Sequence, residues 1–238
     1  MEKKIIRWLS KQVALSGAKG VVLGLSGGID SCVAAALVKR AVGKNRLLAL
    51  ILPIHSHKQD ALDAIAFAKK LGIRVMVIDL SKIYDSLLKI LPQGGKTSSL
   101  NLKPRLRMLV LYYFANKLNY LVCGTSNKSE LSVGYFTKYG DGAADVLPLG
   151  GLLKREVYDL ARALCIPDKI IKKAPTAGLW PRQTDEAEMG ITYAELDEIL
   201  AAYLGKRKQR LAKDKVVKVT AMIERSGHKR EKPLVCPV

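Results

Sequence analysis

The chain is predicted to be an α/β protein with a doubly wound parallel sheet of about five strands, helices on both faces and further helices at the C-terminus. Three observations predict this class. Short apolar runs alternate with segments of helical periodicity. A glycine-rich turn joins the first apolar run directly to a helix. The 238 residues, 49% apolar and 26% charged, show no repeat or linker, so residues 1–238 are expected to form a single domain.

The predicted strands are short runs rich in Val, Ile and Leu, and they lie at residues 21–25, 46–53, 74–79 and 120–124. The predicted helices show apolar residues at helical spacing, and they cover residues 5–15, 32–42, 60–71, 83–91, 104–119, 154–164, 192–204 and 213–227. Residues 92–101 and 174–190 have loop chemistry, and the glycines of 134–144 favour a mobile surface loop. The alternation predicts that ligands bind at the carboxyl ends of the strands.

The net charge of +19 permits a nucleic acid, an acidic surface or a polyanionic small molecule as partner. Lys and Arg are spread along the chain, with modest clusters at 206–210 and 213–218 that are typical of solvated helix faces. With three Phe and two Trp, no platform for stacking bases is indicated. Charge alone therefore leaves the kind of partner undecided.

No apolar run approaches the roughly 20 residues needed to span a bilayer, so no membrane association is expected. The four cysteines, Cys32, Cys123, Cys165 and Cys236, are scattered without a CxxC pair. This spacing favours reduced thiols over a zinc site or a disulfide framework. A cytoplasmic location follows as the expectation.

The strongest local signal is the sequence GLSGGIDS at residues 24–31, between a predicted strand and a predicted helix. Glycines let the backbone approach a ligand closely, and free amides at a helix N-terminus attract phosphate. Ser26 and Ser31 can add hydroxyl donors. Asp30 would be repelled by phosphate unless a cation lay between them, so it is a candidate magnesium ligand. A plain capped turn would not need this combination.

Two familiar phosphate motifs are excluded. A Walker loop needs glycine five residues before Gly95-Lys96, where Ile90 stands, and the dinucleotide fingerprint needs glycine at Ser26. The SGGIDS sequence instead resembles the pyrophosphate loop of the ATP-pyrophosphatase superfamily, whose members cleave ATP between its α and β phosphates and adenylate their substrate. This resemblance implies the α-hydrolase-like fold of that superfamily.

Downstream segments narrow the resemblance. In chain order they are GTSNKSE at 124–130, FTKYGDGAAD at 136–145, LPL at 147–149, KR at 154–155, PTA at 175–177, QTDE at 183–186 and HKR at 228–230. Together these segments resemble the ammonia-dependent NAD synthetases over nearly the whole chain. The resemblance implies a ligase that converts deamido-NAD to NAD with ATP and ammonia, through an acyl-adenylate, releasing AMP and pyrophosphate. It also implies a homodimer.

The resemblance implies roles for individual residues. The ATP positions are Gly24, Leu25, Ser26, Gly27, Gly28, Ile29, Asp30, Ser31, Thr125, Lys154 and Thr176. The magnesium ligands are Asp30 and Glu130, and deamido-NAD is held by Arg105, Lys138, Asp145, His228 and Lys229. These residue types suit the ligands, because Lys and Arg bind phosphate and carboxylate groups and carboxylates bind hard cations such as magnesium. No catalytic nucleophile or general base is predicted.

Two other functions remain open from the sequence. A tRNA-modifying adenylase would use the same loop, and the +19 charge favours it, although a thiolating enzyme would need paired cysteines or a zinc ribbon. A non-catalytic nucleotide sensor would leave Asp30 and Glu130 unexplained. The synthetase-like segments extend from the first loop to residue 230, so a glutaminase domain is not expected.

Overall fold

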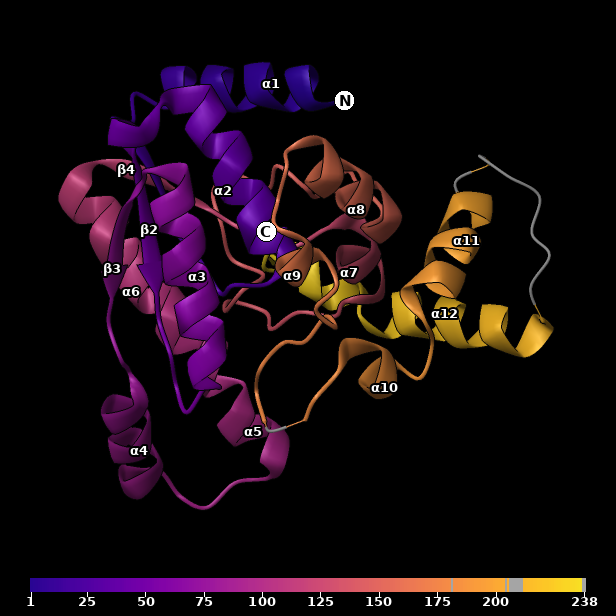
Figure 1. Cartoon of the computed structure of the whole chain (residues 1–238). Coiled ribbons are helices and arrows are strands. Elements are labelled where there is room, and N and C mark those ends of the chain that lie inside the picture. The colour runs from indigo at the N-terminus through magenta and orange to yellow at the C-terminus, as the bar shows by residue number, and fades with distance from the viewer. Residues whose placement is uncertain (181, 204, 206–211, 237–238) are drawn as a thin grey trace.

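The computed structural model describes residues 1–180, 182–203, 205 and 212–236, and Figure 1 shows their arrangement. The predicted basic cluster at 206–210 and the last residue of the predicted helix at 192–204 lie outside the described residues. Within the described part, no helix is long and apolar enough to cross a membrane.

The sheet is parallel, and its strands lie in the order β3-β2-β1-β4. Their bounds are β1 (Gly20–Gly24), β2 (Leu47–Ile51), β3 (Arg74–Val77) and β4 (Tyr120–Cys123). In the central register, Val22 of β1 pairs with Leu48 of β2 and with Val122 of β4. From β1 the chain adds β2 and β3 on one side and then β4 on the other side. In such parallel sheets, ligands bind at the carboxyl ends of the strands where the order of strands changes direction, which here is the carboxyl end of β1.

The predicted number of about five strands is wrong, since the described residues contain four. A single parallel bridge between Cys123 and Val146 lies where a fifth strand would continue the sheet beside β4. Gly124 N donates to Val146 O (2.9 Å) and Val146 N donates to Val122 O (3.2 Å), but Pro148, two residues further on, has no N–H to donate to a ladder. The edge therefore ends after one residue pair.

Helices cover both faces of the sheet, as predicted. One apolar core joins the sheet to α1 (Glu2–Leu15), α2 (Ile29–Val42), α3 (Lys58–Leu71), α8 (Lys154–Ala163) and α9 (Asp168–Ile171). The core on the opposite face joins it to α4 (Ser81–Ile90) and α6 (Leu102–Leu118). The two cores share the strands because successive side chains of a strand point to opposite faces. A short 3-10 helix, η1 (Lys44–Arg46), precedes β2.

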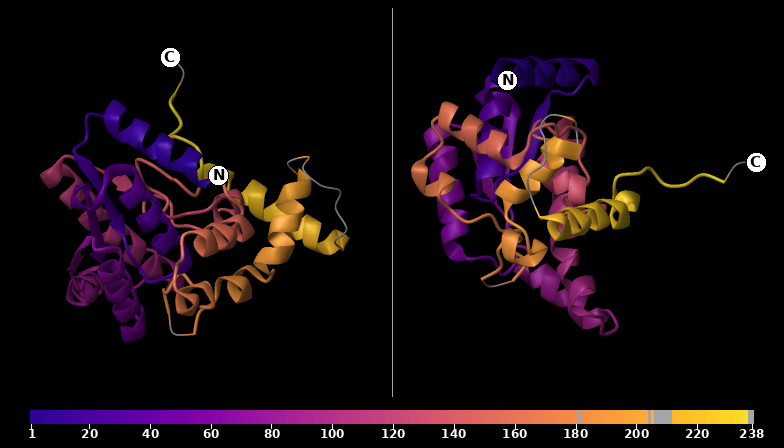
Figure 2. Two further views of the ribbon diagram at one scale, coloured as in Figure 1. Left: turned by 45° about the horizontal axis from the view of Figure 1, so that its top comes forward. Right: turned by 90° about the vertical axis from the view of Figure 1, so that its right-hand side faces the viewer.

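A third apolar cluster lies beside the sheet and consists of α7 (Lys128–Val133), α11 (Tyr193–Tyr203) and α12 (Lys213–Arg225). Figure 1 shows α11 and α12 standing away from the strands, with α7 between them and the body. The 3-10 helix η2 (Gly227–Lys229) follows α12, and the last described residues extend outward from the body in both views of Figure 2.

Four short helices were not predicted: α5 (Lys96–Leu100), α7, α9 and α10 (Asp185–Met189). The prediction of a loop over residues 92–101 is therefore wrong for the part that forms α5. The prediction of an irregular segment over residues 174–190 is wrong for the part that forms α10. Each of these helices has six residues or fewer. A helix so short spans less than two turns, so no apolar periodicity can develop along it.

The segment 134–144 is tied to the body at several points. Gly134 ends α7 in the left-handed conformation (φ 68°), and a side chain there would collide with Ser226. A side chain at Gly140 would crowd the backbone of Arg105, and one at Gly142 would collide with Phe136. These glycines permit close packing, a reason for glycine other than mobility. The mobility of this segment stays a prediction.

Candidate active site

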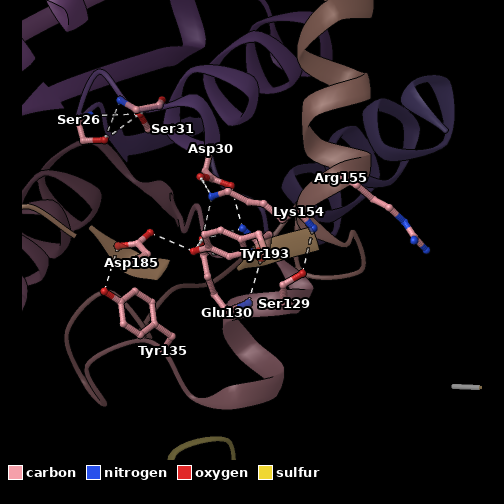
Figure 3. Close-up of polar contacts among 12 residues, drawn as sticks. Ser26, Asp30, Ser31, Ser129, Glu130, Tyr135, Lys154, Arg155, Asp185 and Tyr193 are labelled. Atoms are coloured by element: carbon pink, nitrogen blue, oxygen red, sulfur yellow. Dashed lines mark hydrogen bonds and ion pairs between the residues drawn. The ribbon is translucent and has the colours of Figure 1, made fainter. Parts of the chain in front are cut away.

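The phosphate-loop candidate lies where the sequence predicted it, between the end of β1 at Gly24 and the start of α2 at Ile29. Hydrogen bonds of Ser26 and Ser31 hold the loop in this conformation. Ser31 Oγ donates to Gly28 O (3.0 Å) and accepts from Ser26 N (3.2 Å), while the two serine hydroxyls lie 3.1 Å apart (Figure 3). Gly28 caps α2 without a side chain, so the first amides of this helix carry no side-chain cap. Such amides suit a phosphate ligand.

Gly27 has a structural requirement of its own. Its φ is +80°, and a Cβ placed there would collide with the carbonyl oxygen of Asp60 on α3. Only glycine combines this conformation with so close an approach. The loop therefore packs directly against α3. The Asp60 carboxylate of this helix forms a salt bridge with Lys173.

The first residues of α2, α7 and α8 meet in a buried charge cluster (Figure 3). Lys154 Nζ lies 2.6 Å from Asp30 Oδ2 and 3.1 Å from Glu130 Oε1. Asn127 Nδ2 donates to Asp30 Oδ1 (2.9 Å) and to Glu130 Oε1 (2.7 Å). The side chain of Lys154 is only 1% exposed. The ring of Tyr193 lies 4.6 Å from the ammonium, close enough for a cation–π contact.

Electrostatics keep Lys154 charged in this place. Burial opposes its charged form, but the carboxylates of Asp30 and Glu130 outweigh burial and raise the pKa of Lys154. For Glu130, burial raises the pKa, and the neighbouring Lys154 works against this shift. The two acids therefore favour the charged form of Lys154.

The donor set at this point suits a hard cation. Among the described residues, no group of three or more His, Cys, Asp or Glu is arranged to hold a metal ion. The two predicted ligands, Asp30 and Glu130, nevertheless converge on one positive charge, the ammonium of Lys154. Two carboxylates supply part of an octahedral oxygen set, and phosphate oxygens and water commonly supply the rest.

The other two predicted ATP residues lie in segments around the loop. Thr125 comes two residues after the end of β4, at the same edge of the sheet as the phosphate loop. Thr176 lies in the segment after α9, where its Oγ1 accepts from Gly178 N (3.1 Å). Lys173 ties the start of this segment to Asp60 of α3, beside Gly27.

Four of the five residues predicted to hold deamido-NAD form one chain of contacts. Arg105 Nε donates to Lys138 O (3.3 Å), and Lys138 Nζ donates to His228 O (2.5 Å). Lys229 Nζ donates to Gly134 O (2.7 Å) and Phe136 O (2.9 Å). The turn at 228–229 is therefore bound to the segment 134–138 through main-chain carbonyls.

Asp145, the fifth of these residues, lies at the edge of β4. Its carboxylate accepts from Val122 N (2.7 Å) and from Tyr112 OH (3.1 Å). Together with burial, it raises the pKa of the Tyr112 phenol to about 12. Asp145 thus supports the end of β4 in this structure.

A family model described as NAD synthase matches residues 1–233 of the chain. This chain belongs to the NAD synthase family. It is 50% identical over 238 residues to the NH(3)-dependent NAD(+) synthetase of Archaeoglobus fulgidus, covering 99% of this chain and 96% of that protein. This match supports the sequence-based resemblance.

Two solved structures of relatives confirm the fold. The structure of NMN synthetase from Francisella tularensis has 39% identity and a TM-score of 0.92, and the alignment covers 100% of this chain and 97% of that one. The NH3-dependent NAD synthetase from Campylobacter jejuni, in complex with the nitrate ion, has 32% identity and a TM-score of 0.86, with 99% and 97% covered. The α/β class with a parallel sheet is therefore confirmed for this NAD synthase family member.

Several residues of this candidate site in the NAD synthase family member were not predicted. Tyr193 OH lies within hydrogen-bond distance of two carboxylate oxygens, Glu130 Oε1 (3.2 Å) and Asp185 Oδ2 (3.0 Å). Tyr135 OH also donates to Asp185, at 3.0 Å (Figure 3). Asn127 and Glu130 form a capping box at the start of α7, a pattern readable as Asn-x-x-Glu in the sequence. The tyrosines carry no comparable local signal, because their partners lie 8 to 63 residues away.

Proposed function

We propose that this NAD synthase family member converts deamido-NAD to NAD with ammonia as nitrogen donor, releasing AMP and pyrophosphate from ATP. The observation that carries the proposal is the meeting of the phosphate loop with the Lys154–Asp30–Glu130 cluster at the open end of β1. The 50% identity to an NH(3)-dependent NAD(+) synthetase supports the same activity. The enzyme is a ligase that forms a carbon–nitrogen bond.

In the proposed reaction the nicotinate carboxylate attacks the α-phosphorus of ATP, and the bond to the bridging oxygen breaks. Pyrophosphate leaves with that electron pair while amides of the loop from Gly24 to Ser31 hold it. Lys154 offsets the negative charge that develops on the phosphates. Ammonia then attacks the acyl carbon, AMP leaves, and the added nitrogen loses a proton to solvent. The chain positions reactants and neutralises charge, with no covalent enzyme intermediate.

Magnesium is part of the proposal. Asp30 and Glu130 would hold it, and when bound it would supply positive charge for the departing pyrophosphate. The fit rests on the two carboxylates, which already converge on a cation in Lys154. Thr125 and Thr176 are proposed for ATP, and Arg105, Lys138, Asp145, His228 and Lys229 are proposed for deamido-NAD.

The test is product analysis of the purified chain incubated with ATP, magnesium, deamido-NAD and ammonium. NAD, AMP and pyrophosphate in equal amounts are expected. Pyrophosphate release that requires bulk tRNA and ignores deamido-NAD would overturn the proposal in favour of a tRNA-modifying adenylase.

A second substrate is favoured by one comparison. The Francisella tularensis relative, with a TM-score of 0.92, is named NMN synthetase, so its product is the mononucleotide. The same chemistry would then act on nicotinate mononucleotide, which carries the same reacting carboxylate. Parallel assays with each substrate separate the two activities. We propose deamido-NAD because the curated relatives at 42–50% identity are NAD(+) synthetases.

We further propose that residues 1–238 work as one unit, as a homodimer in the cytoplasm, without a nucleic-acid or membrane partner. The support is the resemblance to the ammonia-dependent synthetases and the small-molecule chemistry of the site. Analytical ultracentrifugation of the purified chain tests the dimer.

A further inference from the structure

The start of helix α8 needs an external cap. Lys154 is the first residue of α8, and the preceding N-cap residue is Leu153, whose side chain cannot accept a hydrogen bond. The first amides of any helix lack partners within the helix, and leaving them buried without acceptors is costly. Leu153 N itself donates to Glu156 Oε2 (2.7 Å). The amides of Lys154 and Arg155 must find acceptors elsewhere.

Asp197 of α11 supplies them from 42 residues further along the chain. Its Oδ2 accepts from Arg155 N at 2.8 Å, and its Oδ1 lies 3.4 Å from Lys154 N. Ser129 Oγ donates to Asp197 Oδ1 and accepts from Lys154 N at 2.9 Å, and Figure 3 shows this serine below the start of α8. Asp197 is 1% exposed and Ser129 is 0% exposed.

These contacts reach both partners of the buried ion pair. Ser129 immediately precedes Glu130 on α7, and Lys154 is itself one of the capped residues. One carboxylate therefore bonds the main-chain amides at the start of α8 and the side chain of Ser129 on α7, on either side of the contact between Lys154 Nζ and Glu130 Oε1. A buried carboxylate is costly unless hydrogen bonds satisfy it. Burial raises the pKa of Asp197, while the bonds from Ser129 and the α8 amides oppose that shift.

We propose that Asp197 is a positioning residue of the amidation reaction, which fixes the starts of α7 and α8 so that the ammonium of Lys154 faces Asp30 and the phosphates. The proposal rests on the proposed function. The physical reason is that the ammonium of Lys154 lies at the end of a four-carbon side chain that starts from the first turn of α8. A small shift of this turn therefore moves the ammonium relative to Asp30. A displacement of about 1 Å at a reacting centre can reduce the rate on the order of 100-fold.

The test is a double-mutant cycle with Asp197→Asn and Lys154→Met. Asn keeps the size and one acceptor oxygen, so the variant is expected to fold. The value of kcat is measured at saturating substrate, with an enzyme concentration high enough for weak activity to stay measurable. We expect Asp197→Asn to lower kcat by roughly 10- to 100-fold in the wild-type background and by less than about twofold when Lys154 is already Met.

Leu200→Ala is the matched control. Leu200 lies on the same helix, is 2% exposed and packs in the α7–α11–α12 cluster, and its apolar side chain has no atom that could accept a hydrogen bond from the amides of α8. Its loss should lower the melting temperature more than Asp197→Asn does while kcat of the folded enzyme stays near that of the wild type. This separates positioning from general weakening of α11.

The proposal is overturned if Asp197→Asn has the same kcat as the wild type, or if it lowers kcat by the same factor in both backgrounds. If Asp197→Asn does not fold, Ser129→Ala enters the same cycle, since it removes the bridge between Asp197 and Lys154 N. An inactive wild type would instead refute the proposed function. ATP affinity by calorimetry then replaces kcat in the cycle, with the same dependence on Lys154 expected.

Discussion

Lys154 Nζ lies 2.6 Å from Asp30 Oδ2 and so joins the first turn of α8 to the first turn of α2, 124 residues away in the sequence. The sequence assigned these residues to two separate tasks, phosphate binding and metal binding. In the structure they satisfy one another. Buried ions need such pairing, because desolvation otherwise outweighs the benefit of either charge.

This pairing predicts that Lys154→Met binds Mn²⁺ more tightly than the wild type when no nucleotide is present. The ammonium occupies the position between the two carboxylates, so a divalent ion must compete with it. We expect about a tenfold gain in affinity, equivalent to ~1.4 kcal/mol. Electron paramagnetic resonance of free Mn²⁺ measures it without any turnover.

The matched control is Lys103→Met. Lys103 is also buried (6% exposed), but its ammonium bonds to the carbonyl of Leu179. Its loss should leave Mn²⁺ affinity unchanged. Equal affinities of Lys154→Met and wild type would show that the lysine does not compete with a metal ion.

Asp30→Asn is expected to reduce pyrophosphate release on the order of 100-fold or more, because the phosphates lose both a metal ligand and the partner that orients Lys154. The fold should persist, since Asn keeps the size of Asp30 and one acceptor oxygen for Asn127 Nδ2, while the contact to Lys154 Nζ is lost. A continuous pyrophosphate assay at saturating magnesium measures the loss. Asp159→Asn, an exposed acid on α8, is the control and should keep full activity. Near-normal turnover of Asp30→Asn would refute the metal assignment.

Arg105→Ala is expected to raise the KM for deamido-NAD by roughly 10- to 100-fold while the KM for ATP changes little. A charge-assisted hydrogen bond is worth roughly 1.5–3 kcal/mol, which sets this range. Steady-state kinetics with each substrate varied separates the two constants. Arg162→Ala, at an exposed site on α8, serves as the control. A parallel rise in both constants would assign Arg105 a structural role through its bond to Lys138 O.

Cys32 and Cys123 are expected to resist alkylation in the native chain. Burial raises the pKa of both thiols to about 12, so almost no thiolate forms at pH 8. Cys165 is exposed and should react under the same conditions. Mass mapping after iodoacetamide treatment, with a guanidinium-unfolded sample as reference, measures each site. Rapid labelling of Cys32 in the folded chain would contradict the buried environment described for it.

The nitrogen donor is predicted to be free ammonia. A glutaminase activity would need a reactive cysteine with a base beside it. Neither Cys32 nor Cys123 meets this requirement, given the raised pKa values of their buried thiols. NAD formation should proceed with ammonium chloride and fail with ammonia-free glutamine. Comparable rates from the two donors would overturn the prediction.

The amino-acid sequence by itself determined the features that depend on neighbouring residues. The strand–turn–helix from Gly20 to Val42 was predictable because apolar runs, glycines and capping residues act within a few positions of one another. Gly27 shows the limit of this reasoning. Its glycine was explained by ligand approach, but the structure adds the carbonyl of Asp60, from a helix that begins 31 residues later.

Tertiary structure alone decided which charged side chains contact one another. The sequence could name Asp30, Glu130 and Lys154 separately, yet only the packing of α2, α7 and α8 places one ammonium between two acids. Asp197 and Tyr193 had no local signal, because their partners come from other helices. The estimate of about five strands came from the usual size of sheets, and the structure has four strands with an isolated bridge between Cys123 and Val146 at the edge. Local chemistry specifies elements, and long-range contacts specify which groups satisfy one another once water is excluded.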